Sequence, residues 1–176
     1  SDAVVLEAGL RFERRDTSYQ DSEGVAFTPD ENMWGGRIAL TYSLHASSMS
    51  YVSLARGYKA GGFNTDGRLD ADLREFDEES LVELELGIKS RFADDTFQMR
   101  LAAFYDQRRN QQVKSSLVRS RADGSSEFVD YLGNAAEGTN AGIEVEANWY
   151  VTDNFRLTTT LGLLEAEFDD FINEFG

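Results

Sequence analysis

Residues 82–92 read Val-Glu-Leu-Glu-Leu-Gly-Ile-Lys-Ser-Arg-Phe. Every second position from Val82 to Ile88 carries an aliphatic side chain, and the positions between them carry glutamate or glycine. A helix would turn neighbouring residues by about 100° and scatter the charges through the apolar stripe, whereas a strand places them on opposite faces. This stretch is therefore predicted to be a strand with one apolar and one polar face.

The same two-residue period recurs along the chain. It is clear in residues 34–44, 97–105, 143–151 and 155–163, and weaker, without any helix signal, in residues 3–16 and 49–60. We predict an all-β fold, an antiparallel meander of about seven strands with roughly 11–15 residues each. Strands of soluble proteins usually have about 5–6 residues, whereas a tilted membrane-crossing strand needs about 9–11. These lengths favour part of a transmembrane β-barrel.

The connections between the predicted strands are of two kinds. Residues 45–48, 93–96 and 152–154 are short and rich in Asp, Asn or Ser, as hairpin turns are. Residues 17–33, 61–80 and 114–137 are long and polar. Because short and long connections alternate, all short turns are expected at one end of the sheet and all long loops at the other, as in outer-membrane barrels.

Two of the turns fix registers that can be checked. The predicted partners are Phe92 with Phe97 and Ile88 with Leu101 around the first turn, and Trp149 with Leu157 and Val145 with Leu161 around the second. Both registers place apolar residues opposite apolar residues, as a single buried or lipid-facing side requires.

The composition excludes several classes of function. With 17 basic and 32 acidic residues the net charge is −15, and such a surface repels a phosphate backbone, so no nucleic-acid partner is expected. The sequence has no cysteine, which excludes a thiolate metal site, and its one histidine, His45, argues against a histidine-based metal centre or a Ser–His–Asp triad. We expect a protein that is not an enzyme, assign no catalytic, metal or cofactor residue, and interpret His45 as an exposed turn residue.

Aromatic residues gather near the ends of the predicted strands. They are Trp34, Tyr51, Tyr58, Phe92, Phe97, Tyr105, Trp149, Tyr150 and Phe155. This placement suits the interfacial girdles of a membrane barrel, although ordinary hairpin packing would also produce it. The alternative is a sheet with one face on a soluble core; strand length and loop asymmetry favour the membrane.

Several polar groups are candidate ligand contacts. The loop 66–79 holds Asp66, Asp70, Asp72, Glu75, Asp77, Glu78 and Glu79, which could bind calcium or a cationic ligand. It lacks the Asp-x-Asp-x-Asp-Gly spacing, so a solvated loop is the favoured interpretation. Arg108, Arg109 and Lys114 at a loop mouth could attract an anionic ligand, against the alternative of a solvated strand end.

The polar face of the predicted strands carries both signs of charge. Its members are Glu83, Glu85, Lys89, Arg91, Arg100, Glu144, Glu146 and Arg156. Charges that solvate a barrel wall and pair across strands are favoured over direct substrate contacts. Gly57, Gly61 and Gly62 precede no predicted helix, so they are expected to allow a bend where a strand leaves the sheet. No individual ligand-binding residue is assigned.

Four segments resemble the barrel of TonB-dependent outer-membrane receptors. Residues 51–64, Tyr-Val-Ser-Leu-Ala-Arg-Gly-Tyr-Lys-Ala-Gly-Gly-Phe-Asn, look like a hallmark of that barrel, and residues 76–92 resemble its next strand through Glu85, Gly87 and Lys89. Residues 133–149 match through Asn134, Ala135, Gly142, Glu144 and Glu146, and residues 163–168 look like the following strand. The family usually has a proline where Glu78 stands.

The resemblance covers nearly the whole chain, most specifically residues 51–168. It implies a receptor of the bacterial outer membrane, surrounded by lipid, that imports a scarce nutrient such as a ferric siderophore, haem, a vitamin or an oligosaccharide. Energy would come from a TonB-type partner acting on a plug domain. Nothing here resembles the plug, and about seven strands fall short of a closed barrel. Residues 1–176 are therefore expected to be barrel wall and extracellular loops from the C-terminal half of a receptor.

Part of a barrel exposes two open sheet edges and an apolar band, so the excised chain is expected to self-associate. The alternative from another class is a self-contained soluble β-domain, an adhesin or carbohydrate-binding module with aromatic-rich loops. Sugar binding by the isolated chain would distinguish that alternative from barrel wall.

Overall fold

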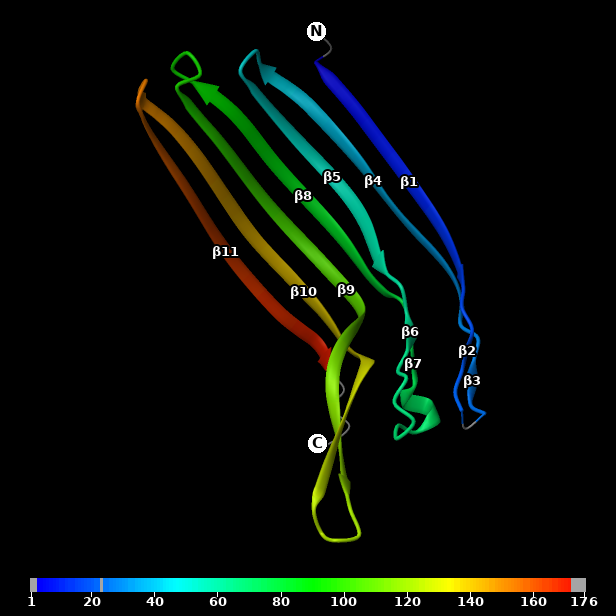
Figure 1. Cartoon of the computed structure of the whole chain (residues 1–176). Coiled ribbons are helices and arrows are strands. Elements are labelled where there is room, and N and C mark those ends of the chain that lie inside the picture. The colour runs from blue at the N-terminus through cyan, green and yellow to red at the C-terminus, as the bar shows by residue number, and fades with distance from the viewer. Residues whose placement is uncertain (1–2, 23, 172–176) are drawn as a thin grey trace.

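Seven long strands form one antiparallel sheet in the computed structural model, which describes residues 3–22 and 24–171 (Figure 1). Each long strand pairs with the next one along the chain, in the order β1-β4-β5-β8-β9-β10-β11. The bounds are β1 Val4–Asp16, β4 Asp30–His45, β5 Ser48–Lys59, β8 Glu79–Phe92, β9 Phe97–Ser120, β10 Ser126–Thr152 and β11 Phe155–Phe171. The predicted all-β meander is confirmed.

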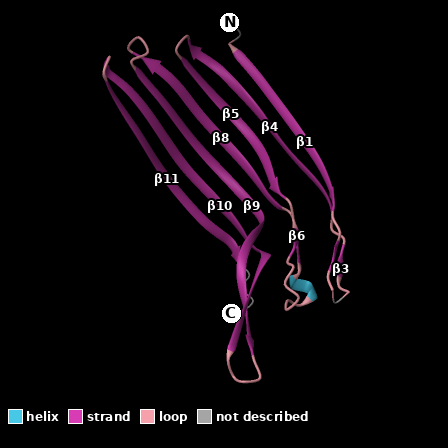
Figure 2. Ribbon diagram, viewed as in Figure 1, coloured by secondary structure: helices cyan, strands magenta, loops and turns pink. Residues whose placement is uncertain are grey.

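The two ends of the sheet differ in their connections (Figure 1). At one end, tight turns join β4 to β5, β8 to β9 and β10 to β11, at the three predicted positions. At the other end the connections are long and contain β2 (Tyr19–Gln20), β3 (Ala26–Phe27), β6 (Gly62–Phe63), the 3-10 helix η1 (Ala71–Leu73) and β7 (Glu75–Phe76) (Figure 2). In the described ranges, no helix has the length and apolar character needed to span a membrane.

Both predicted registers are confirmed. The observed pairs include Phe92 with Phe97, Ile88 with Leu101, Trp149 with Leu157, and Val145 with Leu161. Directly paired residues point to the same face, so one apolar row crosses the sheet as Leu40, Val52, Leu86, Ala103, Ile143 and Leu163. A row on the opposite face reads Arg37, Ala55, Glu83, Asp106 and Asn140. We call these two sides the apolar face and the polar face.

The apolar face has no cover within the described chain. Leu86 is 53% exposed and Leu163 is 74% exposed, and the large residues around them are similarly open. The buried hydrophobic side chains described are Met33, Ala39, Leu69, Val129 and Ala136. A continuous apolar band of this kind is unfavourable in water. It is suited to contact with lipid.

Two strands are much longer than predicted. β9 has 24 residues and β10 has 27, so most of the predicted loop 114–137 is a twisted hairpin that projects beyond the sheet (Figure 1). The register shifts twice near Ala136, and Asn110 takes a positive φ of 52° where the hairpin bends away; Asn tolerates this conformation better than most residues. The prediction of a long polar loop over residues 114–137 was wrong in its secondary structure: the alternation that identifies the membrane strands is missing there because neither face of the projecting part needs to be apolar.

Other boundaries need smaller corrections. β1, β5 and β8 have 13, 12 and 14 residues, within the predicted range, whereas β4 has 16 and β11 has 17. Tyr51 was expected in an aromatic girdle, but it lies in the interior of β5 on the polar face, opposite Gly87. A Cβ at Gly87 would overlap the Tyr51 ring, so the glycine makes room for the ring.

Candidate functional site

Three segments project from the loop end of the sheet (Figure 1), and side-chain hydrogen bonds join them. We call residues 17–22 and 24–29 the first loop, residues 60–78 the central loop, and residues 110–137 of β9 and β10 the long hairpin. Leu69, Arg74 and Val129 lie in these segments and are each at most 5% exposed. Much of the buried packing in the described chain is therefore between loops. The sheet positions the loops, and the loops stabilise one another.

Arg74 joins the central loop to the first loop. Its Nη1 and Nη2 both donate to Asp21 Oδ2 at 3.1 Å, and its guanidinium carbon lies 5.7 Å from the ring centre of Tyr19 and 5.2 Å from that of Phe27. The Tyr19 hydroxyl donates to the Thr65 carbonyl at 3.4 Å. A buried arginine with a carboxylate and two rings around it fixes the relative position of the two loops.

Side-chain amides join the central loop to the long hairpin. Asn64 Nδ2 donates to the Leu132 carbonyl, and Asn64 Oδ1 accepts from the Leu132 N–H, both at 2.9 Å. In the opposite direction, Asn134 Oδ1 accepts from the Asp77 N–H at 2.6 Å and Asn134 Nδ2 donates to the Asp77 carbonyl at 3.0 Å. Each amide reproduces the two-bond exchange of an antiparallel strand pair. The N–H and C=O of Leu132, on an edge of the hairpin that pairs with no further strand in the described chain, are thus hydrogen-bonded by a side chain.

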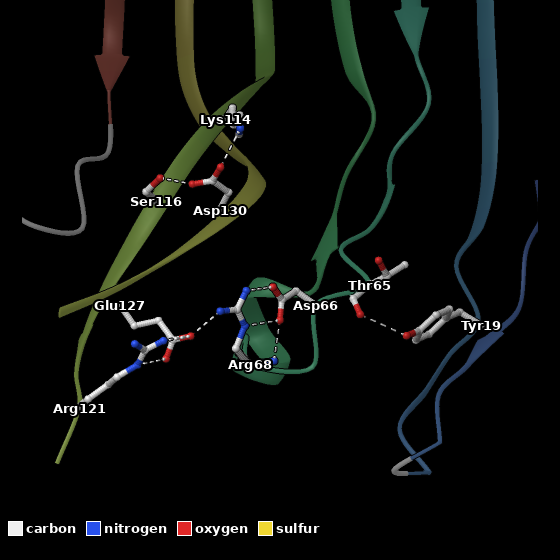
Figure 3. A network of polar contacts seen from close by, with 9 residues as sticks. All are labelled: Tyr19, Thr65, Asp66, Arg68, Lys114, Ser116, Arg121, Glu127 and Asp130. Atoms are coloured by element: carbon white, nitrogen blue, oxygen red, sulfur yellow. Dashed lines mark hydrogen bonds and ion pairs between the residues drawn. The ribbon is translucent and has the colours of Figure 1, made fainter. Parts of the chain in front are cut away.

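An ionic network reinforces this contact (Figure 3). Arg68 contacts Asp66 at 2.6 Å within the central loop and Glu127 of the long hairpin at 2.5 Å, and Arg121 contacts Glu127 at 3.2 Å. Hydrogen bonds from the Arg68 side chain and backbone lower the pKa of Asp66 from 3.8 to about 2. Hydrogen bonds from Arg121 and Arg68 likewise lower the pKa of Glu127. The network keeps both carboxylates ionised well below neutral pH.

The base of the loop cluster is held by Glu79 and Gln112. Glu79 accepts from Arg108 Nη1 at 3.0 Å and from the Gln112 N–H at 2.9 Å. The Gln112 side chain donates to the Ala60 carbonyl at 2.9 Å and to the Asp77 carbonyl at 3.0 Å. The start of β8, the end of the central loop and the start of the long hairpin therefore share one polar junction.

The chain leaves β5 at Gly61, as the glycine pattern predicted. The Gly61 N–H donates to Glu31 at 2.9 Å, and its carbonyl accepts from Arg15 at 2.5 Å. A Cβ at Gly61 would overlap the Glu31 carboxylate and the backbone of residue 76. Gly57 and Gly62 lie inside β5 and β6 instead.

The candidate ligand residues are mostly engaged in ion pairs. In the acidic loop, Asp66, Asp70, Glu78 and Glu79 pair with Arg68, Arg119, Arg56 and Arg108. Lys114 contacts Asp130 at 2.8 Å, and hydrogen bonds from Lys114 and Ser116 lower the pKa of Asp130. Across the described residues, no group of acidic or histidine side chains is arranged to hold a metal ion. Among these ion pairs, only that of Asp70 with Arg119 joins the central loop to the long hairpin; the others lie within one segment or reach a strand end.

The polar face behaves as a solvated wall. Arg100 pairs across strands with Glu146 at 3.2 Å, as predicted for this row, and Lys89 Nζ lies 5.0 Å from the Tyr51 ring centre. At the tight-turn end, Arg91 contacts Asp95 at 3.3 Å. His45 ends β4 and is exposed.

Sequence reasoning assigned no role to Arg74, Asn64 or Asn134. Asn64 and Asn134 stand within the segments that carry the family resemblance, but their partners lie 68 and 57 positions away. No local pattern identifies such contacts.

Comparisons with known proteins agree with this architecture. The family description "TonB dependent receptor-like, beta-barrel" matches residues 1–174. The pesticin receptor of Yersinia pestis is 25% identical over 175 residues, which cover 96% of this chain and 24% of the relative. The crystal structure of the ferric yersiniabactin uptake receptor FyuA from Yersinia pestis superposes with a TM-score of 0.76 and 22% identity, over 98% of this chain and 26% of that one. The crystal structure of the siderophore receptor PiuA from Acinetobacter baumannii superposes with a TM-score of 0.69 and 18% identity, over 96% of this chain and 24% of that one.

The chain belongs to the family of TonB-dependent receptors and has the architecture of their β-barrel wall. It is an outer-membrane protein, as the members of that family are. The chain spans about a quarter of the length of the curated relatives that it matches. The apolar face is therefore the lipid-facing side, the polar face is the inner side, and the loop cluster lies at the extracellular end.

Proposed function

We propose that the complete protein is an outer-membrane receptor that takes up a scarce nutrient, and that residues 1–176 supply barrel wall and extracellular loops. The observation that carries the proposal is the loop cluster: three long segments are joined above the polar face by Arg74 and by the Asn64 and Asn134 amides. A loop surface fixed in this way can present one shape to a ligand arriving from outside.

A ferric siderophore is the nutrient that we favour. The relatives are named for pesticin and for ferric yersiniabactin uptake, and the structural neighbours include a siderophore receptor. Haem, a vitamin or an oligosaccharide are the other candidates. The energy for release into the periplasm would come from a TonB-type protein acting on the plug domain of the complete receptor.

Uptake by cells tests the proposal. A strain lacking the gene should lose uptake of radiolabelled iron supplied as ferric yersiniabactin, and the complete gene should restore it. Uptake of haem, cobalamin and maltodextrin is measured in the same strains. Loss of one of these instead would identify a different nutrient, and no change in any of them would contradict a role in uptake.

The soluble alternative is tested separately. An adhesin or carbohydrate module should bind glycans as the isolated chain and should be found in a soluble or secreted fraction at 19.7 kDa. The exposed apolar band counts against this alternative. An immunoblot that finds a larger protein confined to the outer membrane would exclude it.

A further inference from the structure

A shallow pocket of about 310 Å³ lies on the polar face, where β4, β5, β8 and β9 reach the tight turns. One row of directly paired residues crosses it, which reads Ser43, Met49, Lys89 and Arg100. The next row toward the turns adds Arg91 and Gln98. Because directly paired residues point to the same face, the pocket faces the interior of the barrel at the end opposite the loops.

Three cationic side chains surround this pocket. Lys89 and Arg100 stand directly opposite each other on β8 and β9, which places their Cβ atoms about 5 Å apart. Arg91 follows two positions after Lys89 on the same face of β8. Like charges that face each other across two strands are destabilising. An anion between them would remove this repulsion.

The carboxylates nearby compensate only part of the charge. Arg100 pairs with Glu146 at 3.2 Å, and Arg91 pairs with Asp95 at 3.3 Å. Both pairs are exposed, so each contributes little and can be exchanged for a stronger anion. No carboxylate of the described residues forms an ion pair with Lys89. Three cations therefore share two loosely held carboxylates.

Uncharged donors complete the lining of the pocket. They include the hydroxyls of Ser43 and Ser47, the amide of Gln98 and the ring of His45, whose Nδ1 lies 3.3 Å from Ser47 Oγ. Of the described residues that line the pocket, none is Asp or Glu. Ammonium, guanidinium, hydroxyl and amide groups together form a donor set for carboxylate or phosphate oxygens.

The charge of the polar face reverses a few rows closer to the loops. There Glu83 stands directly opposite Asp106, and the rows between them and Lys89 carry Glu85 and Glu144. Glu83 and Lys89 are six residues apart, about 20 Å along the strand. A small anion is thus repelled by the acidic rows and attracted to the cationic pocket.

We propose that this pocket binds a small oxyanion with several carboxylate or phosphate oxygens, held by Lys89, Arg91 and Arg100. The loop end is extracellular, so the pocket lies at the periplasmic end of the inner wall. The anion would be either the imported nutrient, at its last contact before release, or a small anion of the periplasm. The first source rests on the proposed function, whereas the oxyanion site itself does not.

Lysine footprinting of the purified complete receptor tests the site. The chain has three lysines, Lys59, Lys89 and Lys114, and reductive methylation followed by peptide mass spectrometry measures the rate at each. Citrate at ten times its Kd should slow the methylation of Lys89 about tenfold, because about nine-tenths of the sites are then occupied. Lys59 and Lys114 should be unaffected. Neutral triethyl citrate, and sodium chloride at matched ionic strength, should protect none of the three.

Variants test which cations hold the anion. Arg100→Gln should raise the citrate concentration needed to protect Lys89 about tenfold, because a charge-assisted hydrogen bond is lost. Arg37→Gln removes the same charge from the polar face in the row of Glu83 and, as the matched control, should leave protection unchanged. An unchanged unfolding temperature of each variant shows that the barrel is intact.

Three results would overturn the proposal. They are a wild type in which citrate does not protect Lys89, equal protection in the wild type and Arg100→Gln, and a Lys89 that resists methylation even without citrate. The last result would mean that the pocket is covered in the complete receptor.

Iron uptake by cells distinguishes the two sources of the anion. If the anion is the nutrient, Lys89→Gln should slow the uptake of radiolabelled iron supplied as ferric yersiniabactin severalfold, and Lys89→Arg, which keeps the charge, should restore it. Unchanged uptake together with citrate protection would assign the site to periplasmic anions. A wild type that takes up no iron would contradict the proposed nutrient, while citrate protection would still support the oxyanion site.

Discussion

Arg74 is the buried arginine that joins the central loop to Asp21 of the first loop. Its side chain is 3% exposed and that of its partner Asp21 is 14% exposed, so removing the arginine leaves a carboxylate in a poorly solvated place. We predict that Arg74→Ala costs the loop cluster about 3 kcal/mol. The exposed pair of Arg14 with Asp30, at 62% and 52% exposure, is the control, and Arg14→Ala should have little effect because solvent screens exposed ion pairs.

Hydrogen–deuterium exchange in the complete receptor measures this difference. Arg74→Ala should speed exchange in the first loop and the central loop while leaving β4, β5 and β8 unchanged. Equal protection in the two variants would show that Arg74 does not fix the loops.

Asn64 offers a sharper test, because one substitution removes two of the three hydrogen bonds of its side-chain amide. Asn64→Asp keeps the acceptor for the Leu132 N–H but replaces the donor to the Leu73 and Leu132 carbonyls with an oxygen. We predict a loss of about 1–3 kcal/mol, the usual cost of leaving buried polar groups unsatisfied. Exchange at residues 130–134 should rise. If Asn64→Asp and the wild type exchange alike, the amide pairing is not what holds the hairpin.

The long hairpin is the element whose attachment should depend on pH. Asp66 and Glu127 have pKa values below their ordinary 3.8 and 4.5 because arginines hydrogen-bond to them. A carboxyl with a lowered pKa contributes stability that is complete above its unfolded value and is lost as the pH falls toward its folded value. The contact between the central loop and the hairpin should therefore hold at neutral pH and weaken between about pH 4.5 and pH 2.

Spin labels can measure this opening. The sequence has no cysteine, so labels at Asp72→Cys and Ser126→Cys report the separation of the two segments. The distance should widen as the pH falls through that window, and Asp66→Asn should shift the widening to higher pH. A distance that stays constant down to pH 2 would contradict the ionic contribution.

At the same scale, the strands show what sequence can and cannot predict. Residues 82–92 alternate because a strand between lipid and a polar interior must present different chemistry on its two faces, and that constraint predicted strands, turns and registers. Beyond the membrane both faces meet water, so residues 114–120 and 126–137 lose the alternation and were predicted as loop. The contacts of Arg74 are equally hard to predict from the sequence, since its partner Asp21 lies 53 positions away.

At the scale of the whole molecule, the seven-stranded sheet has two open edges in the described chain. β1 and β11 each have one strand partner in the described chain, and the face between them exposes side chains such as Leu10 at 65% and Leu161 at 64%. In the outer membrane, lipid covers that face. In water, the free edges are templates for further pairing and the band favours association.

The isolated chain is therefore predicted to self-associate in detergent-free buffer and to become monodisperse when detergent covers the apolar face. Analytical ultracentrifugation of the 19.7 kDa chain, with and without detergent micelles, measures both states, and a dye that binds apolar surfaces reports how much of the band stays open. Self-association removed by detergent is what barrel wall requires, since the driving force is burial of the lipid-facing band. A monomer that is stable in plain buffer and binds no dye would mean that the chain covers its own apolar face, as a soluble β-domain does. That result would contradict the prediction that the apolar face stays uncovered until lipid or detergent reaches it.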